Sequence, residues 1–211
     1  MGPLDHVAGL GEVLDELDVP RVLGGSLASS LMGEPRSTND VDIALRLTPE
    51  RVPDLVNLVK ADYLASVEAL TTAAATHDSF KLLHHHSSFK IDLFFLGDGD
   101  LDRLQIERRQ LLDLDGLTRP IWVTAPEDVV LRKLWWFRLG GAVSDRQWND
   151  VVAIIRVQGR RLDRVTLSAD ATRNGLAELL NRAFEDAGGL GHGRPANPLN
   201  GCGRACPDLL R

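Results

Sequence analysis

Three aspartates in two apolar segments are the residues whose types and spacing could do chemistry. Asp40 and Asp42 stand two residues apart at the start of one segment, and Asp92 interrupts a later one, residues 90–96. Residues i and i+2 of a strand point to the same face, with a backbone separation of about 6–7 Å. Carboxylate oxygens at this spacing can hold one hard divalent cation, Mg²⁺ or Mn²⁺, or bridge two of them.

The same aspartates have a simpler interpretation as solvated residues on exposed strand faces. Two like charges side by side repel, however, and a strand gains nothing from them without a cation. Asp92 would be costly to bury in so apolar a segment unless it is paired. A metal ion shared by Asp40, Asp42 and Asp92 would pair all three, so we expect them to form a metal-binding set.

A glycine pair precedes the aspartates. Gly24-Gly25-Ser26 follows a short apolar strand, residues 21–23, and opens a segment of small and apolar residues. Glycines at such a point let the backbone approach a phosphate, and amide hydrogens at a helix start bind the anion. A plain turn is the simpler alternative for these glycines taken alone.

Hydrophobic periodicity indicates an α/β (α+β) core followed by a helical C-terminal part. Two capping-box patterns, Thr124 with Glu127 and Ser144 with Gln147, predict two helix starts. We expect a turn at residues 97–100. Expected helices cover residues 4–17, 26–32, 67–75, 124–139, 144–158 and 176–187, with a further start at 48–50, and expected strands cover 21–23, 41–47, 80–85, 90–96 and 121–123. The predicted domains are 1–110, 111–187 and a disordered tail, 188–211.

Composition narrows the class of protein. The 211 residues are 44% hydrophobic and 26% charged, which is ordinary for a globular chain. A formal charge of -6 argues against non-specific binding of nucleic acid over the whole surface. No apolar run could span a membrane and the first 17 residues lack a secretion signal, so we expect a cytoplasmic protein. Cys202 and Cys206, in the tail, are weak evidence for a metal site.

Two motifs together resemble a known superfamily. Residues 23–26, Leu-Gly-Gly-Ser, followed by residues 36–43, Arg-Ser-Thr-Asn-Asp-Val-Asp-Ile, resemble the signature of the polymerase-β-like nucleotidyltransferases. The Arg-x-Thr-x-Asp-x-Asp spacing is similar to that of AbiEii-type abortive-infection toxins, as are the segments 127–134 and 144–151. The resemblance covers about residues 22–187 and implies a nucleotidyltransferase-type mixed sheet flanked by helices.

The resemblance also implies roles for the motif residues. Asp40 and Asp42 would hold two metal ions and the triphosphate, and Asp92 would bind the catalytic metal and help deprotonate a hydroxyl. Nucleotide-binding residues would be Gly24, Gly25, Ser26, Arg36, Thr38 and Lys133. Arg36 could instead brace its loop, and Lys133 could be a surface lysine.

Other polar and aromatic residues stay ambiguous in the sequence. Asp145, Arg146 and Asp150 could serve the site or a helix surface. His84-His85-His86 could include a metal site, but a strand-pairing face is the simpler interpretation. Helix packing is more typical than base stacking for the aromatic residues Trp135, Trp136, Phe137 and Trp148.

The function that this resemblance implies is metal-dependent transfer of a nucleoside monophosphate from a nucleoside triphosphate to a hydroxyl. The acceptor would be an RNA such as tRNA, or a protein. A toxin role, with a cognate antitoxin protein as partner, follows from the subgroup. Two alternatives stay open: a catalytically silent nucleotide-binding regulatory module, and an enzyme that modifies a small molecule such as an antibiotic.

Overall fold

The computed structural model describes residues 2–38, 40–87, 89–117 and 119–189. They form two compact units: the first contains residues up to 27 and 37–124, and the second contains 28–36 and residues from 125 on. The sequence-based domain bounds, 1–110 and 111–187, differ from the bounds of these units and stay a prediction. Nearly all of the predicted tail, with Cys202 and Cys206, lies outside the described residues.

The first unit alternates helices and strands. Its helices are α1 (Pro3–Glu16), the start of α2 (Gly25–Met32), α3 (Val52–Val59), α4 (Val67–Thr76) and α5 (Asp100–Glu107), with a 3-10 turn at Pro49–Arg51. Its strands are β1 (Arg21–Leu23), β2 (Asp40–Leu45), β3 (Tyr63–Leu64), β4 (Ser79–His84), β5 (Lys90–Phe95), β6 (Gln110–Leu112) and β7 (Ile121–Val123).

The described strands form one mixed sheet in the order β3-β4-β5-β2-β1-β7-β6. Strand β2 lies at the centre, parallel to β5 and antiparallel to β1. Strand β4 pairs antiparallel with β5 on its other edge. The mixed sheet confirms the predicted α/β class.

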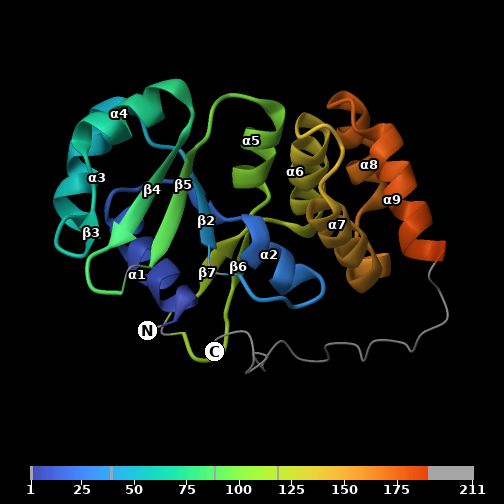
Figure 1. Cartoon of the computed structure of the whole chain (residues 1–211), viewed down its shortest axis with the longest axis horizontal. Coiled ribbons are helices and arrows are strands. Elements are labelled where there is room, and N and C mark those ends of the chain that lie inside the picture. Colours follow the sequence, from blue (N-terminus) through green and yellow to red (C-terminus); the bar gives the residue numbers. More distant parts are fainter. Residues whose placement is uncertain (1, 39, 88, 118, 190–211) are drawn as a thin grey trace. The chain divides into compact units, whose positions relative to one another are not determined.

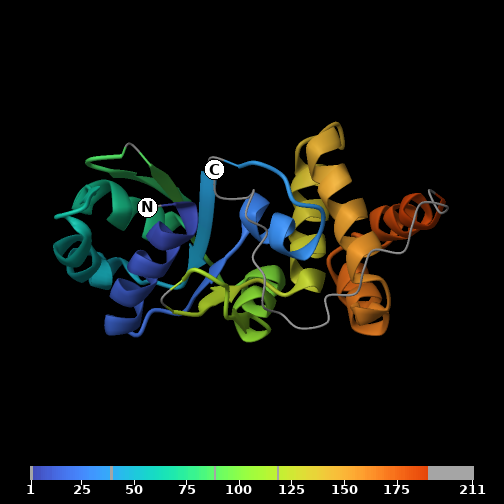
Figure 2. The ribbon, with the colours of Figure 1, turned by 90° about the horizontal axis from the view of Figure 1, so that it is seen from below.

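The two faces of the sheet differ in what covers them. Helices α1, α3 and α4 lie together on one side (Figures 1 and 2). Val41, Ile43 and Leu45 alternate along β2 and are all buried. On the opposite face Ala44, near the end of β2, belongs to a core cluster with Ile106 of α5. The start of β2 on that face is more open, since Asp40 is exposed. A carboxylate pair there can stay hydrated or meet a ligand.

The second unit is helical, as the sequence predicted. It contains the rest of α2, then α6 (Pro126–Leu139), α7 (Asp145–Gln158), a 3-10 turn at Gly159–Arg161, α8 (Arg164–Arg173) and α9 (Ala177–Gly189). Helix α6 packs on α7, and α9 packs on both α7 and α8. Leu131, Leu134, Ile154 and Leu167 are fully buried and form the interior of these helices.

The prediction that Thr124 and Glu127 form a capping box is wrong. Helix α6 begins at Pro126 with Ala125 as N-cap, and no side chain caps it. The Thr124 hydroxyl instead donates to the carbonyl of Leu23, 2.9 Å away, and ties β1 to β7. Of the two hydrogen bonds in the capping box predicted at Ser144, the first is confirmed. The Gln147 backbone N–H donates to the Ser144 hydroxyl at 3.4 Å.

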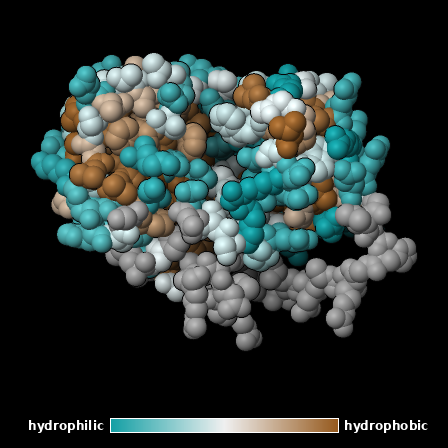
Figure 3. All heavy atoms as spheres, viewed as in Figure 1, coloured by the Kyte–Doolittle hydropathy of each residue, from teal (hydrophilic) through white to brown (hydrophobic). Residues whose placement is uncertain are grey.

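No described helix is both long and apolar enough to cross a bilayer. Hydrophobic side chains are nevertheless visible among hydrophilic ones on the face drawn in Figure 3. In the first unit Leu64 and Val67 are exposed, and in the second Leu139 and Val143 are exposed. Scattered exposed hydrophobic residues are normal on protein surfaces and need no functional explanation.

Candidate functional site

The structure places the three predicted aspartates on one face of the sheet. Asp42 of β2 and Asp92 of β5 are direct partners in the parallel register. Side chains of directly paired strand residues lie on the same face, and Asp40 shares it because it precedes Asp42 by two positions. Asp40 is exposed, whereas Asp42 and Asp92 are half-buried. The three acids, far apart in the sequence, therefore share one partly open face.

A lysine continues this row of charged residues. In the antiparallel pairing of β4 with β5, Lys81 is the partner of Asp92. The Lys81 Nζ lies 3.2 Å from Asp92 Oδ1, with the Lys81 side chain 54% exposed and that of Asp92 20% exposed. Lys81, Asp92 and Asp42 thus lie side by side on three neighbouring strands.

The predicted glycine pair lies directly beside Asp42. The Gly24 backbone donates to the Asp42 carbonyl at 2.9 Å. Gly25, at the start of α2, has a φ of +59°, and a Cβ built on it would fall 1.7 Å from Asp42 Oδ2. Only glycine fits there, both for its backbone conformation and for the space. Ser26, half-buried, is the next residue of α2. The predicted phosphate-binding glycines and the Asp42 carboxylate therefore lie against each other.

The chemistry of these side chains fits a hard divalent cation. Asp40, Asp42 and Asp92 present carboxylate oxygens on one face, the donors that Mg²⁺ and Mn²⁺ prefer. Among the described residues, however, no three His, Cys, Asp or Glu side chains lie close enough together to hold a metal ion. Asp92 faces Lys81 instead.

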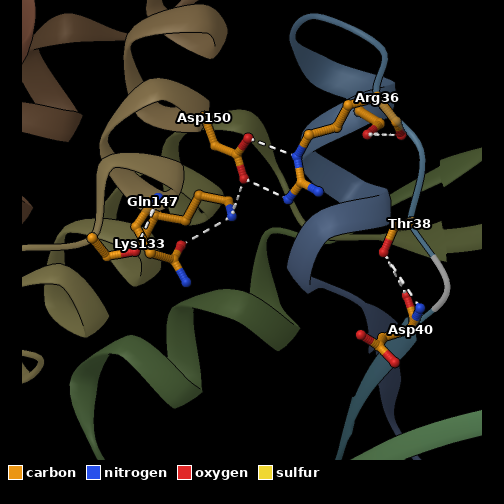
Figure 4. A network of polar contacts seen from close by, with 8 residues as sticks. Arg36, Thr38, Asp40, Lys133, Gln147 and Asp150 are labelled. Atoms are coloured by element: carbon orange, nitrogen blue, oxygen red, sulfur yellow. Dashed lines mark hydrogen bonds and ion pairs between the residues drawn. The ribbon is translucent and has the colours of Figure 1, made fainter.

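Thr38 belongs to the same unit and orders the start of β2. The Thr38 hydroxyl donates to the Asp40 carbonyl at 3.2 Å, and the Asp40 backbone N–H donates to the Thr38 hydroxyl oxygen at 3.4 Å (Figure 4). These two contacts help to fix where Asp40 stands at the start of the strand. The predicted role of Thr38 in nucleotide binding stays a prediction.

Arg36 and Lys133 meet a common carboxylate within the second unit. Arg36 Nε and Nη2 lie 2.9 Å from Asp150 Oδ1 and Oδ2, and Lys133 Nζ lies 2.7 Å from Oδ2 (Figure 4). Lys133 Nζ also donates to Gln147 Oε1 at 3.1 Å. The lysine is buried rather than on the surface, with only 6% of its side chain exposed. Asp150 therefore fixes both predicted phosphate-binding cations.

The surroundings of Asp150 keep it charged. Burial favours the neutral carboxyl, but hydrogen bonds from Arg36 and Lys133, together with their charges, hold its pKa below the ordinary value. The loop after α2, helix α6 and helix α7 are joined by this ionised group. Asp145 and Arg146, which the sequence left ambiguous, are exposed at the start of α7.

Of the histidine run, His84 packs against α1, whereas His85 and His86 are exposed. The His84 ring lies 4.7 Å from that of buried His6, and His6 stacks on Phe89. Burial, and next the charge of His84, lower the pKa of His6. His84 Nδ1 accepts from the Ser87 backbone at 3.1 Å. These contacts fit the structural interpretation of the run.

Of the aromatic residues in the second unit, Phe137 and Trp148 pack between helices α6 and α7, whereas Trp136 is exposed. The Phe137 and Trp148 rings lie 5.1 Å apart, and the Trp148 indole donates to Asp186 at 2.9 Å. Such contacts agree with a packing role for these rings.

The fold of this chain is similar to that of known proteins. No protein-family profile matches the sequence, and no curated protein is similar to it. The crystal structure of an antigenic nucleotidyltransferase-like protein from Paracoccidioides brasiliensis matches with a TM-score of 0.51 and 16% identity, over 88% of this chain and 94% of that one. The chain has a nucleotidyltransferase fold. The predicted nucleotidyltransferase-type fold is thereby confirmed, and the superfamily and its AbiEii-type subgroup stay predictions.

Two further nucleotidyltransferases are similar over most of their length. The antibiotic-resistance factor ANT(2'')-Ia matches with a TM-score of 0.48 and 14% identity, over 83% of this chain and 95% of that one. The lincosamide antibiotic adenylyltransferase LnuA matches with a TM-score of 0.42 and 10% identity, over 70% and 92%. Both TM-scores are lower than that of the Paracoccidioides brasiliensis protein, which carries the fold assignment.

Two features of the site, the position of Lys81 and the pairing of Asp150, were not predicted from local sequence patterns. Lys81 was not singled out, because strand register decides which residue faces Asp92 and no local pattern gives register. The double role of Asp150 was also missed, although it was noted as ambiguous. Its position one helical turn from Gln147 and the nearby cations could have indicated a buried pairing.

Proposed function

We propose that this chain is a metal-dependent nucleotidyltransferase that moves a nucleoside monophosphate from a nucleoside triphosphate to a hydroxyl acceptor. The observation that carries the proposal is the direct pairing of Asp42 with Asp92, on the face that Asp40 shares and beside Gly25. The nucleotidyltransferase fold supports the same reaction class.

The proposed reaction is one displacement at phosphorus. The acceptor oxygen bonds to the α-phosphorus, the bond from that phosphorus to the bridging oxygen of the β-phosphate breaks, and pyrophosphate leaves. Asp92 takes part in removing the hydroxyl proton. Gly25 and Ser26 hold the β- and γ-phosphates through backbone N–H groups and the Ser26 hydroxyl, while Gly24, whose own N–H donates to Asp42, lets the backbone come close to the phosphates.

Asp40, Asp42 and Asp92 would hold Mg²⁺ or Mn²⁺, which when bound neutralises charge on the triphosphate and the leaving pyrophosphate. The residues supply positioning and fixed charge, which dominate catalysis of phosphoryl transfer. Arg36, Thr38 and Lys133 remain proposed nucleotide-binding residues.

The acceptor is proposed at the level of chemistry. A hydroxyl of RNA, such as tRNA, or of a protein follows from the resemblance to AbiEii-type toxins, and so does an antitoxin partner. A small-molecule hydroxyl and a silent regulatory module are the alternatives. The acceptor pool of the experiment must therefore contain all these classes.

Transfer of labelled α-phosphate tests the proposal. The purified chain is incubated with each α-labelled nucleoside triphosphate, Mg²⁺, total RNA, lysate protein and an aminoglycoside and lincosamide mixture. We expect label in one acceptor class and release of pyrophosphate. Asp42→Asn should lower the rate by a factor of about 100 or more, because it removes charge that stabilises the transferring group.

The matched control is Asp98→Asn, which makes the same chemical change at an exposed aspartate after β5. We expect it to transfer at the wild-type rate. Absence of labelled product, together with equal nucleotide binding by wild type and Asp42→Asn, would favour the silent regulatory module.

A further inference from the structure

Lys81 occupies the position at which a cation would meet Asp92. Its Nζ lies 3.2 Å from Asp92 Oδ1, and the two residues are direct partners across β4 and β5. On the other side, Asp92 is the direct partner of Asp42. Two carboxylates in adjacent positions repel each other, and the ammonium group relieves that repulsion.

We propose that Lys81 is the resident counterion of Asp92, which a divalent cation must displace, so that Lys81 sets the metal concentration that the site requires. The proposal rests on the proposed function and adds a positioning residue to it. The lysine side chain is long, flexible and 54% exposed. Its ammonium group can therefore move away from the Asp92 carboxylate into solvent at a small cost in free energy.

The proposal distinguishes Lys81 from a purely structural ion pair. A structural lysine would stabilise the folded chain by the same amount with or without metal. A counterion that competes with metal stabilises only the metal-free chain, because metal binding to the same carboxylate replaces it. Removing the lysine should therefore weaken the metal-free fold and strengthen metal binding at once.

The affinity for Mn²⁺ is measured by titrating the full-length chain with Mn²⁺. The electron paramagnetic resonance signal reports the concentration of free Mn²⁺ at each step. We expect Lys81→Met to bind Mn²⁺ with a dissociation constant roughly threefold to tenfold below that of wild type, the range of one exposed, screened unit charge. The difference should shrink as the salt concentration rises.

Two variants control the titration. Lys81→Arg keeps the charge and should bind Mn²⁺ as wild type does. Lys60→Met makes the same change in net charge at the exposed end of α3, where Lys60 Nζ donates to Asn57 at 3.2 Å, and should leave affinity unchanged.

Thermal unfolding supplies a second readout. Without metal, Lys81→Met should unfold about 1–3 °C below wild type, and saturating Mn²⁺ should remove that difference. Equal Mn²⁺ affinity in wild type and Lys81→Met, or an equal rise in Lys60→Met, would overturn the role of Lys81 and leave the proposed function standing. Failure of wild type and every variant to bind Mn²⁺ would overturn both.

Discussion

At the scale of single residues, Gly25 and Asp42 show how backbone conformation and chemistry are linked. The residue types came from the sequence, because two aspartates at i and i+2 and a glycine pair are local patterns. Their contact could not be predicted from those patterns, since it depends on the pairing of β1 with β2. A Cβ at Gly25 would fall 1.7 Å from Asp42 Oδ2, so this position admits no other residue.

Gly25→Ala should therefore lower both stability and nucleotide binding. The left-handed conformation costs an alanine about 1–2 kcal/mol, and the clash adds to that cost. Gly116→Ala is the matched control, since Gly116 also has a positive φ, +88°, but nothing lies within 4 Å of its Cβ position. Urea unfolding and nucleotide titration of both variants measure the two effects. Equal behaviour of the variants would show that the contact with Asp42 has no consequence.

At the scale of elements, the sequence predicted those with a clear apolar run or a clear helix start. Strands 21–23 and 121–123 and the extent of α7 were right. Helix α5 was missed because residues 97–100 were interpreted as a turn, and its N-cap Gly99 makes no side-chain cap. Helix α8 was missed because only three of its residues, Leu167, Asp170 and Ala171, are buried, which leaves a weak apolar pattern.

The ionised Asp150 joins elements that are distant in the sequence. Its replacement therefore tests how much the contact between these elements contributes to stability. Asp150→Ala removes the carboxylate that Arg36 and buried Lys133 share, so we expect a loss of about 3–5 kcal/mol in the free energy of unfolding. Asp15→Asn is the control: exposed Asp15 accepts two hydrogen bonds from Arg21, at 2.6 and 2.7 Å, and should cost about 1 kcal/mol or less.

The pH dependence of the Asp150 effect follows from the direction of its pKa. The pKa is lower in the folded chain, so the carboxylate stabilises the fold fully above its unfolded pKa, about 3.9, and less as pH falls through the folded value. The difference between wild type and Asp150→Ala should narrow below about pH 4. Urea unfolding at pH 7 and pH 3 measures it, and a constant difference would argue against an ionised Asp150.

At the scale of the whole molecule, the fold and the position of the aspartates are both compatible with the proposed function. The chain has a nucleotidyltransferase fold, and its first unit carries the three carboxylates, the glycine pair and Lys81. The net charge of -6 is compatible with an enzyme that binds a charged nucleotide through a bound cation and local backbone groups. Fold alone does not establish activity, so the site must be tested itself.

The most direct measurement follows the aspartate carboxylates themselves. The chain is labelled with ¹³C at the aspartate side-chain carboxyl carbons, and a non-hydrolysable nucleoside triphosphate with Mn²⁺ is added in small amounts. We expect the resonances of Asp40, Asp42 and Asp92 to broaden first, while that of Asp98 persists. Unchanged signals from these three, with broadening at other aspartates, would contradict the account.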